Sequence, residues 1–151
     1  MTDLNIRQAT IHDLALIVPL FDAYRSFYGQ PSDEAGARSY LTARLGQLES
    51  VILLAQHEGA ANAAGFVQLY PSFSSISMKR LWILNDLFVH TLYRKGGVAS
   101  RLLEAAKRHA VATGAKGLTL STALDNVGAQ RLYERAGYER DEAFCYYDLT
   151  L

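Results

Sequence analysis

The stretch Leu81–Arg101 reads LWILNDLFVHTLYRKGGVASR. It begins as an apolar strand, continues through a short basic turn with two glycines, and ends in the first residues of a helix. The first amides of a helix have no intrahelical partner and point outward at the positive end of the helix dipole. A strand, a glycine turn and a helix in this order therefore predict a site that holds phosphate groups.

The spacing inside the turn excludes the two common nucleotide signatures. The chain has no G-x-x-x-x-G-K-[ST] motif and no G-x-G-x-x-G motif with an acidic residue further on. What remains is Arg94-x-x-Gly97-x-Ala99, directly after the strand and at the start of a helix over about Gly97–Thr113. A nucleotide-binding regulator is therefore disfavoured. If the protein were one, ATP or GTP should compete with the ligand that the turn holds.

The length and composition of the chain exclude several classes of protein. The 151 residues suffice for one domain, half of them are hydrophobic, and the 15 basic side chains are balanced by 15 acidic ones. This balance argues against a nucleic-acid partner. A lone cysteine, Cys145, excludes an internal disulfide, and the four histidines show no ligand spacing, so no metal is expected. Neither a signal segment nor a membrane span is visible, and we expect a cytoplasmic protein without a membrane partner.

The pattern along the chain predicts a mixed α/β sheet. Strands are expected at Leu4–Ala9, Val51–Ala55, Ala64–Tyr70, Leu81–Val89 and Leu118–Thr122, with one or two closing strands after Tyr138, the last at Tyr146–Leu151. Helices are expected from about Ile11, from Ser32, over about Gly97–Thr113, and from Asp125 or Asn126 to Gly137. The second and third strands should form an antiparallel hairpin, whereas the long helix between the fourth and fifth strands should make that pair parallel.

Several residues give local signals. Thr10 and Asp13 form a capping-box pattern, and Pro19 should kink the helix that follows. The segment Pro71–Ser75 is expected to be a loop. Cys145 lies among aromatic residues of the closing strands and is expected to be a small core residue.

A second motif makes the phosphate turn more specific. It reads Asn126-x-x-Ala129-x-x-x-Tyr133-x-x-x-Gly137-Tyr138. Together with Arg94-x-x-Gly97-x-Ala99 it resembles the signatures of the GCN5-related N-acetyltransferases, over essentially the whole chain. Tyr24-x-x-Phe27-Tyr28-Gly29 and the run LYPSFSS resemble the subgroup of histone-and-other-protein acetyltransferases and their small bacterial relatives.

The resemblance implies a fold and a co-substrate. The fold is a single α/β domain over residues 1–151, with a mixed central sheet of six to seven strands, about four flanking helices and a parallel strand pair around the cofactor site. The co-substrate is acetyl-coenzyme A, without a metal. Its diphosphate would be held by the turn, namely Arg94, Lys95, Gly96, Gly97, Val98, Ala99 and Ser100. Lys95 stands where a glycine is common in the family, and this could alter the shape of the turn.

The family pattern also assigns roles along the rest of the cofactor. The pantetheine arm would lie like an extra strand along Leu87, Phe88 and Val89, and Asn126 would contact it. Tyr133 would give a proton to the leaving thiolate, because a phenol is neutral at pH 7. The apolar stripe on which Tyr133 lies would equally suit a core tyrosine.

The acceptor side is less complete. Relatives often carry a glutamate just before the aspartate of this strand, but here the pair is Asn85-Asp86, and asparagine takes no proton. Three alternatives remain open: Asp86 acts as a catalytic base through a water, the base lies elsewhere, or the acceptor arrives neutral. Asp86 would also suit a cap on a neighbouring turn. The expected substrate-binding residues are Tyr24, Phe27, Tyr28 and Asn85, although the three aromatic residues have the spacing of core positions.

These features predict an acyltransferase that moves acetyl from acetyl-coenzyme A directly to a primary amine in a ternary complex. Small amines, amino acids and lysine side chains all remain possible acceptors. The alternative is a non-catalytic acyl-coenzyme A binding module with a regulatory role, favoured by Asn85 and opposed by Tyr133. Close relatives pair through edge and closing strands, so a homodimer is expected.

Overall fold

The computed structural model describes residues 3–151. By its internal contacts the chain divides into two compact units, one ending at Ser121 and the other spanning Thr122–Leu151. Each unit is described by itself.

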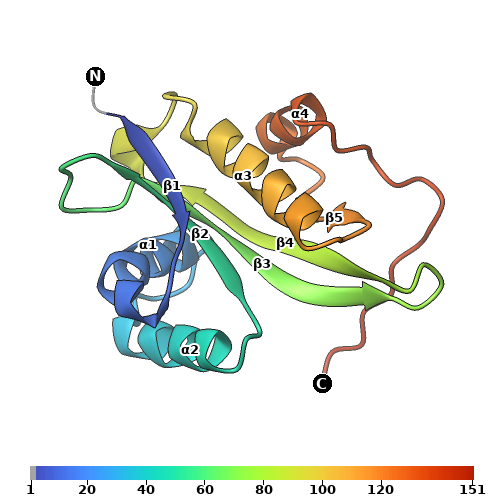
Figure 1. The fold of residues 1–151 in the computed structure, drawn as a ribbon, viewed down its shortest axis with the longest axis horizontal. Coiled ribbons are helices and arrows are strands. Elements are labelled where there is room, and N and C mark those ends of the chain that lie inside the picture. The colour runs from blue at the N-terminus through green and yellow to red at the C-terminus, as the bar shows by residue number, and fades with distance from the viewer. Residues whose placement is uncertain (1–2) are drawn as a thin grey trace. The chain divides into compact units, whose positions relative to one another are not determined.

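The first unit is built on a five-stranded sheet (Figure 1). Its strands, in order both along the chain and across the sheet, are β1 (Leu4–Gln8), β2 (Val51–His57), β3 (Gly65–Ser74), β4 (Lys79–Val89) and β5 (Gly117–Thr119). The first four are antiparallel, and β5 pairs parallel to β4. The predicted hairpin and the predicted parallel pair are both confirmed.

Three α-helices belong to this unit. They are α1 (Leu14–Phe27), α2 (Glu34–Gly46) and α3 (Val98–Ala112), with short 3-10 turns η1 (Ile11–Asp13) and η2 (Thr91–Tyr93) before α1 and α3. The predicted capping box at Thr10 and Asp13 is present, because the amide of Thr10 donates to Asp13 Oδ2 at 2.8 Å. Helix α1 continues without a break through Pro19, and the kink stays a prediction. Helix α2 is capped by Asp33, one residue later than expected.

The predicted loop at Pro71–Ser75 is wrong, because β3 continues to Ser74 opposite the start of β4. The ladder between β2 and β3 ends at the Val51–Leu69 pair, so β3 is an edge strand beyond Leu69 on that side. A proline is tolerated there, because no hydrogen bond is required from it on the open side.

Side chains of both sheet faces are buried against helices. One cluster joins α1 and α2 to Ile52, Leu54, Phe66 and Phe88 of the sheet. Trp82 belongs to the other face, where its Nε1 donates to Thr113 Oγ1 at the end of α3, at 2.8 Å. Helices therefore cover the sheet on two sides, α1 and α2 on one and α3 on the other (Figure 1).

The second unit contains one helix, α4 (Val127–Arg135). Asn126 caps it by accepting from the Ala129 amide at 3.2 Å, and Gly137 follows with a φ of +97°, as predicted. The predicted closing strands are wrong, because no described residue after Thr119 belongs to a strand, and the sheet has five strands rather than six to seven. Alternating apolar residues form a strand only where a neighbouring strand offers backbone partners. Cys145 is exposed and is not a core residue.

Candidate active site

A β-bulge in β4 determines which face of the sheet Asp86 occupies. The ladder with β3 pairs Gln68 with Asp86 and then Leu69 with Leu84, so Asn85 has no opposing residue. One extra residue reverses the alternation of side chains along the strand. Trp82 thus packs toward α3, whereas Asp86 faces the side of α1 and α2.

Asp86 is buried, at 5% exposure, in a shell of hydrogen-bond donors. Gln68 Nε2 donates to Asp86 Oδ2 at 2.7 Å, and Asn85 Nδ2 donates to Asp86 Oδ1 at 3.1 Å. Burial raises the pKa of the Asp86 carboxyl, and hydrogen bonds from Gln68, Tyr24 and Asn85 offset part of that rise. A carboxylate with a raised pKa is better matched to taking a proton near neutral pH than an ordinary surface aspartate.

The side chain of Gln68, which donates to Asp86, is itself held by a further hydrogen bond. Gln68 is fully buried on β3, and its Oε1 accepts from Ser50 Oγ at 2.7 Å. The chain of contacts thus runs from Ser50 through Gln68 to Asp86. Our sequence interpretation missed Ser50 and Gln68. The available signal was a glutamine inside the apolar strand expected at Ala64–Tyr70.

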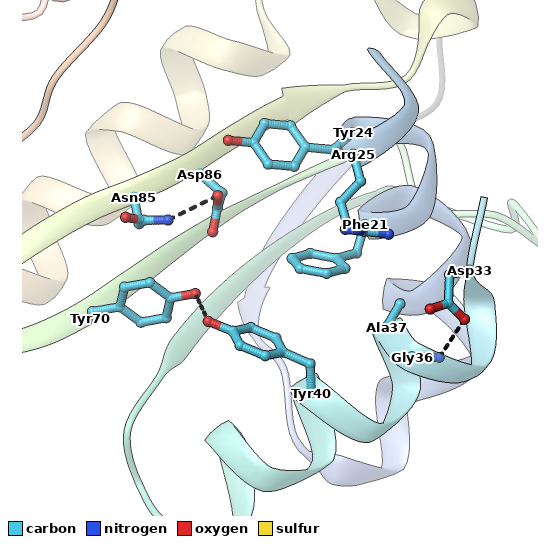
Figure 2. A pocket seen from close by; sticks show the side chains of 10 residues that line it. All are labelled: Phe21, Tyr24, Arg25, Asp33, Gly36, Ala37, Tyr40, Tyr70, Asn85 and Asp86. Carbon is cyan, nitrogen blue, oxygen red and sulfur yellow. Dashed lines mark hydrogen bonds between the residues drawn. The ribbon is translucent and has the colours of Figure 1, made fainter. Parts of the chain in front are cut away.

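A cavity of about 410 Å³ opens beside Asp86, lined by residues of α1, α2, β3 and β4 (Figure 2). Phe21, Tyr24 and Arg25 come from α1, and Tyr40 comes from α2. Tyr70 from β3 is hydrogen-bonded to Tyr40, with their hydroxyl oxygens 2.7 Å apart. Desolvation is the main cause that raises the pKa of Tyr70, so it stays a neutral phenol.

The predicted acceptor residues divide into two groups. Tyr24 and Asn85 line the cavity together with Asp86. Phe27 and Tyr28 do not line it and are 63% and 62% exposed. Tyr24 also packs edge-on against Phe66 and Phe88, so it serves both the core and the cavity. Our sequence interpretation did not select Phe21, Arg25, Tyr40 or Tyr70 as acceptor residues.

The phosphate turn has the backbone that such a site needs. Lys95 and Gly97 adopt left-handed conformations, with φ of +63° and +79°, and Gly97 is the N-cap residue of α3. Because Gly97 has no side chain to cap the helix, it does not occupy the first amides of α3. Val98 is buried, whereas Gly96 and Ser100 are exposed.

The side chain of Arg94 turns back toward β4. Its Nε donates to the Val89 carbonyl at 3.1 Å, and its guanidinium lies 5.4 Å and 5.6 Å from the ring centres of Phe27 and Phe88. This arrangement ties the segment between β4 and α3 to the strand. The Arg94 guanidinium is directed away from the turn, so backbone groups are the donors that the turn offers to a ligand.

β4 also offers a strand edge. β5 pairs with β4 only at Leu81–Ile83, so within the described residues the segment from Leu84 to Val89 pairs with β3 alone. The predicted arm-binding residues Leu87, Phe88 and Val89 all lie in this segment. An extended, amide-rich ligand suits such an edge.

Asn126 and Tyr133 both lie in the second unit. The side-chain oxygen of Asn126 is used in capping α4, and the ring of Tyr133 lies 5.9 Å from that of Tyr138. Across residues 3–151 no group of side chains has the make-up of a metal site, and no helix is long and apolar enough to cross a membrane.

Comparisons with known proteins point to one family of enzymes. A family model described as the acetyltransferase (GNAT) family matches residues 17–138. An uncharacterised N-acetyltransferase of Bacillus subtilis, YhfO, is 53% identical over 148 residues, which is 98% of each chain. The crystal structure of a probable acetyltransferase, 46% identical, superposes with a TM-score of 0.93 over 97% of each chain.

A more distant structure shares the fold. Aminoglycoside N-acetyltransferase AAC(6')-Iy, solved in complex with coenzyme A, superposes with a TM-score of 0.80 at 21% identity, over 100% of this chain and 97% of its own. The family match covers most of the chain, and the close relatives are themselves described as acetyltransferases. The protein therefore belongs to the GNAT family of acetyltransferases and is an acyltransferase.

Proposed function

We propose that the protein transfers acetyl from acetyl-coenzyme A directly to a primary amine. The observation that carries this proposal is a buried carboxylate, Asp86, in a cavity on the strand that leads to the phosphate turn. The amine nitrogen forms a bond to the acetyl carbon as the carbon–sulfur bond breaks. Counted from the ammonium form, the nitrogen gives up two protons, of which the coenzyme A thiolate takes up one and the solvent receives the other.

The co-substrate fits the residues of the turn and the strand edge. The backbone amides from about Gly96 to Ser100 would hold the diphosphate, and Leu87, Phe88 and Val89 would pair with the pantetheine arm. Asn126 would contact that arm. The coenzyme supplies the activated thioester, while the chain binds and orients it.

Two residues would handle the protons. Asp86 would accept a proton from the amine, directly or through a water, and Tyr133 would donate one to the departing thiolate. An alkylamine has a reference pKa near 10.4, so only about one molecule in a few thousand is neutral at pH 7. A carboxylate with a raised pKa beside the amine is therefore useful. Since these residues lie in different units, we also propose that residues 1–151 act as one domain.

The second candidate is a non-catalytic acyl-coenzyme A binding module with a regulatory role. Asn85 favours it, because its amide donates to Asp86 instead of supplying the glutamate common in relatives. The cavity beside Asp86 favours the enzyme. We further propose a cytoplasmic protein that acts as a homodimer.

The test is a calorimetric titration with acetyl-coenzyme A of the wild type, Gly97→Glu and Gly59→Glu. A carboxylate at Gly97 should abolish binding by repelling the diphosphate. Gly59 is the matched control, because its φ of +75° resembles the +79° of Gly97 and both positions have open space around them. Binding should survive there.

Thiol release across an amine panel then separates the enzyme from the regulatory module. No binding by the folded wild type would overturn both. Binding without thiol release from any amine would favour the module.

A further inference from the structure

The acceptor cavity carries opposite charges from different elements. Asp86 lies on β4 and Arg25 lies on α1, and the stick view shows both among the lining side chains (Figure 2). The third charged lining residue, Asp33, caps α2, because its Oδ1 accepts from the Gly36 amide. The ammonium of an acceptor would therefore be drawn to Asp86, and Arg25 is the cation of the lining.

Arg25 is half-buried and keeps most of its donors unused. Its Nη1 donates to the Pro31 carbonyl at 3.5 Å, and no ion pair involving Arg25 is present in residues 3–151. The neighbouring Asp22 accepts from the Ser32 hydroxyl at 2.6 Å and the Asp33 amide at 2.7 Å, and these bonds, together with a smaller effect of the Arg25 charge, lower the pKa of Asp22. A guanidinium in a cavity wall with free donors matches a carboxylate in geometry and charge.

The tyrosine pair adds a donor. Between Tyr40 and Tyr70 one hydroxyl donates to the other at 2.7 Å. The accepting hydroxyl keeps its own hydrogen, which is then available to an oxygen atom outside the pair. Both residues line the cavity, and Figure 2 shows their hydroxyl groups meeting on the side where Asp86 lies, so the pair belongs to the amine end of the cavity.

From these features we infer that the acceptor is an amino acid, whose amine lies at Asp86 and whose free carboxylate is bound by Arg25. The rings of Phe21 and Tyr24 supply an apolar part of the lining. A cavity of about 410 Å³ is within the range of small-molecule sites. Polyamines and aminoglycosides fit poorly, because they present several cations and no anion to Arg25. The inference rests on the proposed function.

The test compares acceptors that differ only in the carboxylate. Thiol release is measured for lysine against 1,5-diaminopentane and for phenylalanine against 2-phenylethylamine, with acetyl-coenzyme A saturating. The acids should have the higher kcat/KM, by about tenfold or more, as expected for charge-assisted hydrogen bonds. In Arg25→Gln the KM of the acids should rise by a similar factor, and the gap within each pair should close.

Arg38→Gln is the control, because Arg38 is exposed on α2 and is not part of the cavity lining. It should retain the preference.

Two results overturn the inference. If the decarboxylated amines are used as well as the acids and Arg25→Gln changes nothing, the inference fails while the proposed function stands. If no member of either pair releases thiol although acetyl-coenzyme A binds, a titration of the coenzyme A complex with lysine decides. Absence of lysine binding then rejects the amino-acid site as well as the transfer.

Discussion

The Asp86 carboxylate depends on three donors that come from other positions in the sheet and in α1. Its raised pKa places the loss of its proton above the usual range of an aspartate, so acetyl transfer should rise with pH through that pKa. In Asp86→Asn this acid limb should disappear, and kcat should fall by about 10²-fold to 10⁴-fold. Acetyl-coenzyme A affinity should be unchanged, since Asp86 lies in the acceptor cavity.

Gln68→Leu gives a graded version of the same test. The substitution removes the donor to Asp86 Oδ2 and leaves Ser50 Oγ without its acceptor. Because the lost hydrogen bond favours the charged carboxylate, the pKa of Asp86 should rise further and the acid limb should move to higher pH. Stability should fall by about 1–3 kcal/mol. If the acid limb of the pH profile is unchanged in both Asp86→Asn and Gln68→Leu, another group is the base.

At the scale of elements, the start of α1 is tied to β1 by a charge pair. Arg7 of β1 donates from Nη2 to Asp13 Oδ1 at 2.7 Å, and the Thr10 amide donates to the same carboxylate. The hydrogen bond from Arg7 is the main cause that lowers the pKa of Asp13 to about 2. Asp13 thus holds both the capping box and the strand that precedes it.

The sign of the resulting pH dependence follows from the lowered pKa. Asp13 contributes its full stability above its ordinary pKa of about 3.9 and loses it as pH falls through about 2. Asp13→Asn should therefore be less stable than the wild type at pH 6, and the difference should shrink toward pH 2. Urea denaturation at each pH measures it. Asp125→Asn serves as a control, since Asp125 forms no ion pair in residues 3–151.

At the scale of the whole molecule, the proposed reaction draws on both units. Asp86 and the phosphate turn lie before Ser121, whereas Tyr133 lies after it. In Tyr133→Phe, kcat should fall by about a hundredfold or more because the thiolate loses its proton donor, while acetyl-coenzyme A should still bind. Stopped-flow thiol release and calorimetry measure the two quantities.

Tyr147→Phe is the matched control, because Tyr147 is 93% exposed. It should keep wild-type turnover. Equal losses in both variants, or none in Tyr133→Phe, would remove Tyr133 from the proton-donor role.

The sequence alone determined the elements whose cause is local. The glycine turn before α3, the capping box at Thr10 and the glycine after α4 follow from backbone preferences that a few neighbouring residues express. The order of strands and helices then led to the correct parallel pair. The prediction of closing strands was wrong because a strand needs a neighbouring strand, and the alternating pattern of Tyr146–Leu151 does not show whether one is present.

The tertiary structure decided the acceptor cavity. The face on which Asp86 lies depends on one unpaired residue, Asn85, and apolar alternation does not reveal where a bulge falls. Arg25, Tyr40 and Tyr70 line one cavity only because α1, α2 and β3 pack on the same face of the sheet. Local preference thus determined the turn proposed for the co-substrate, whereas contacts between distant segments formed the cavity proposed for the acceptor.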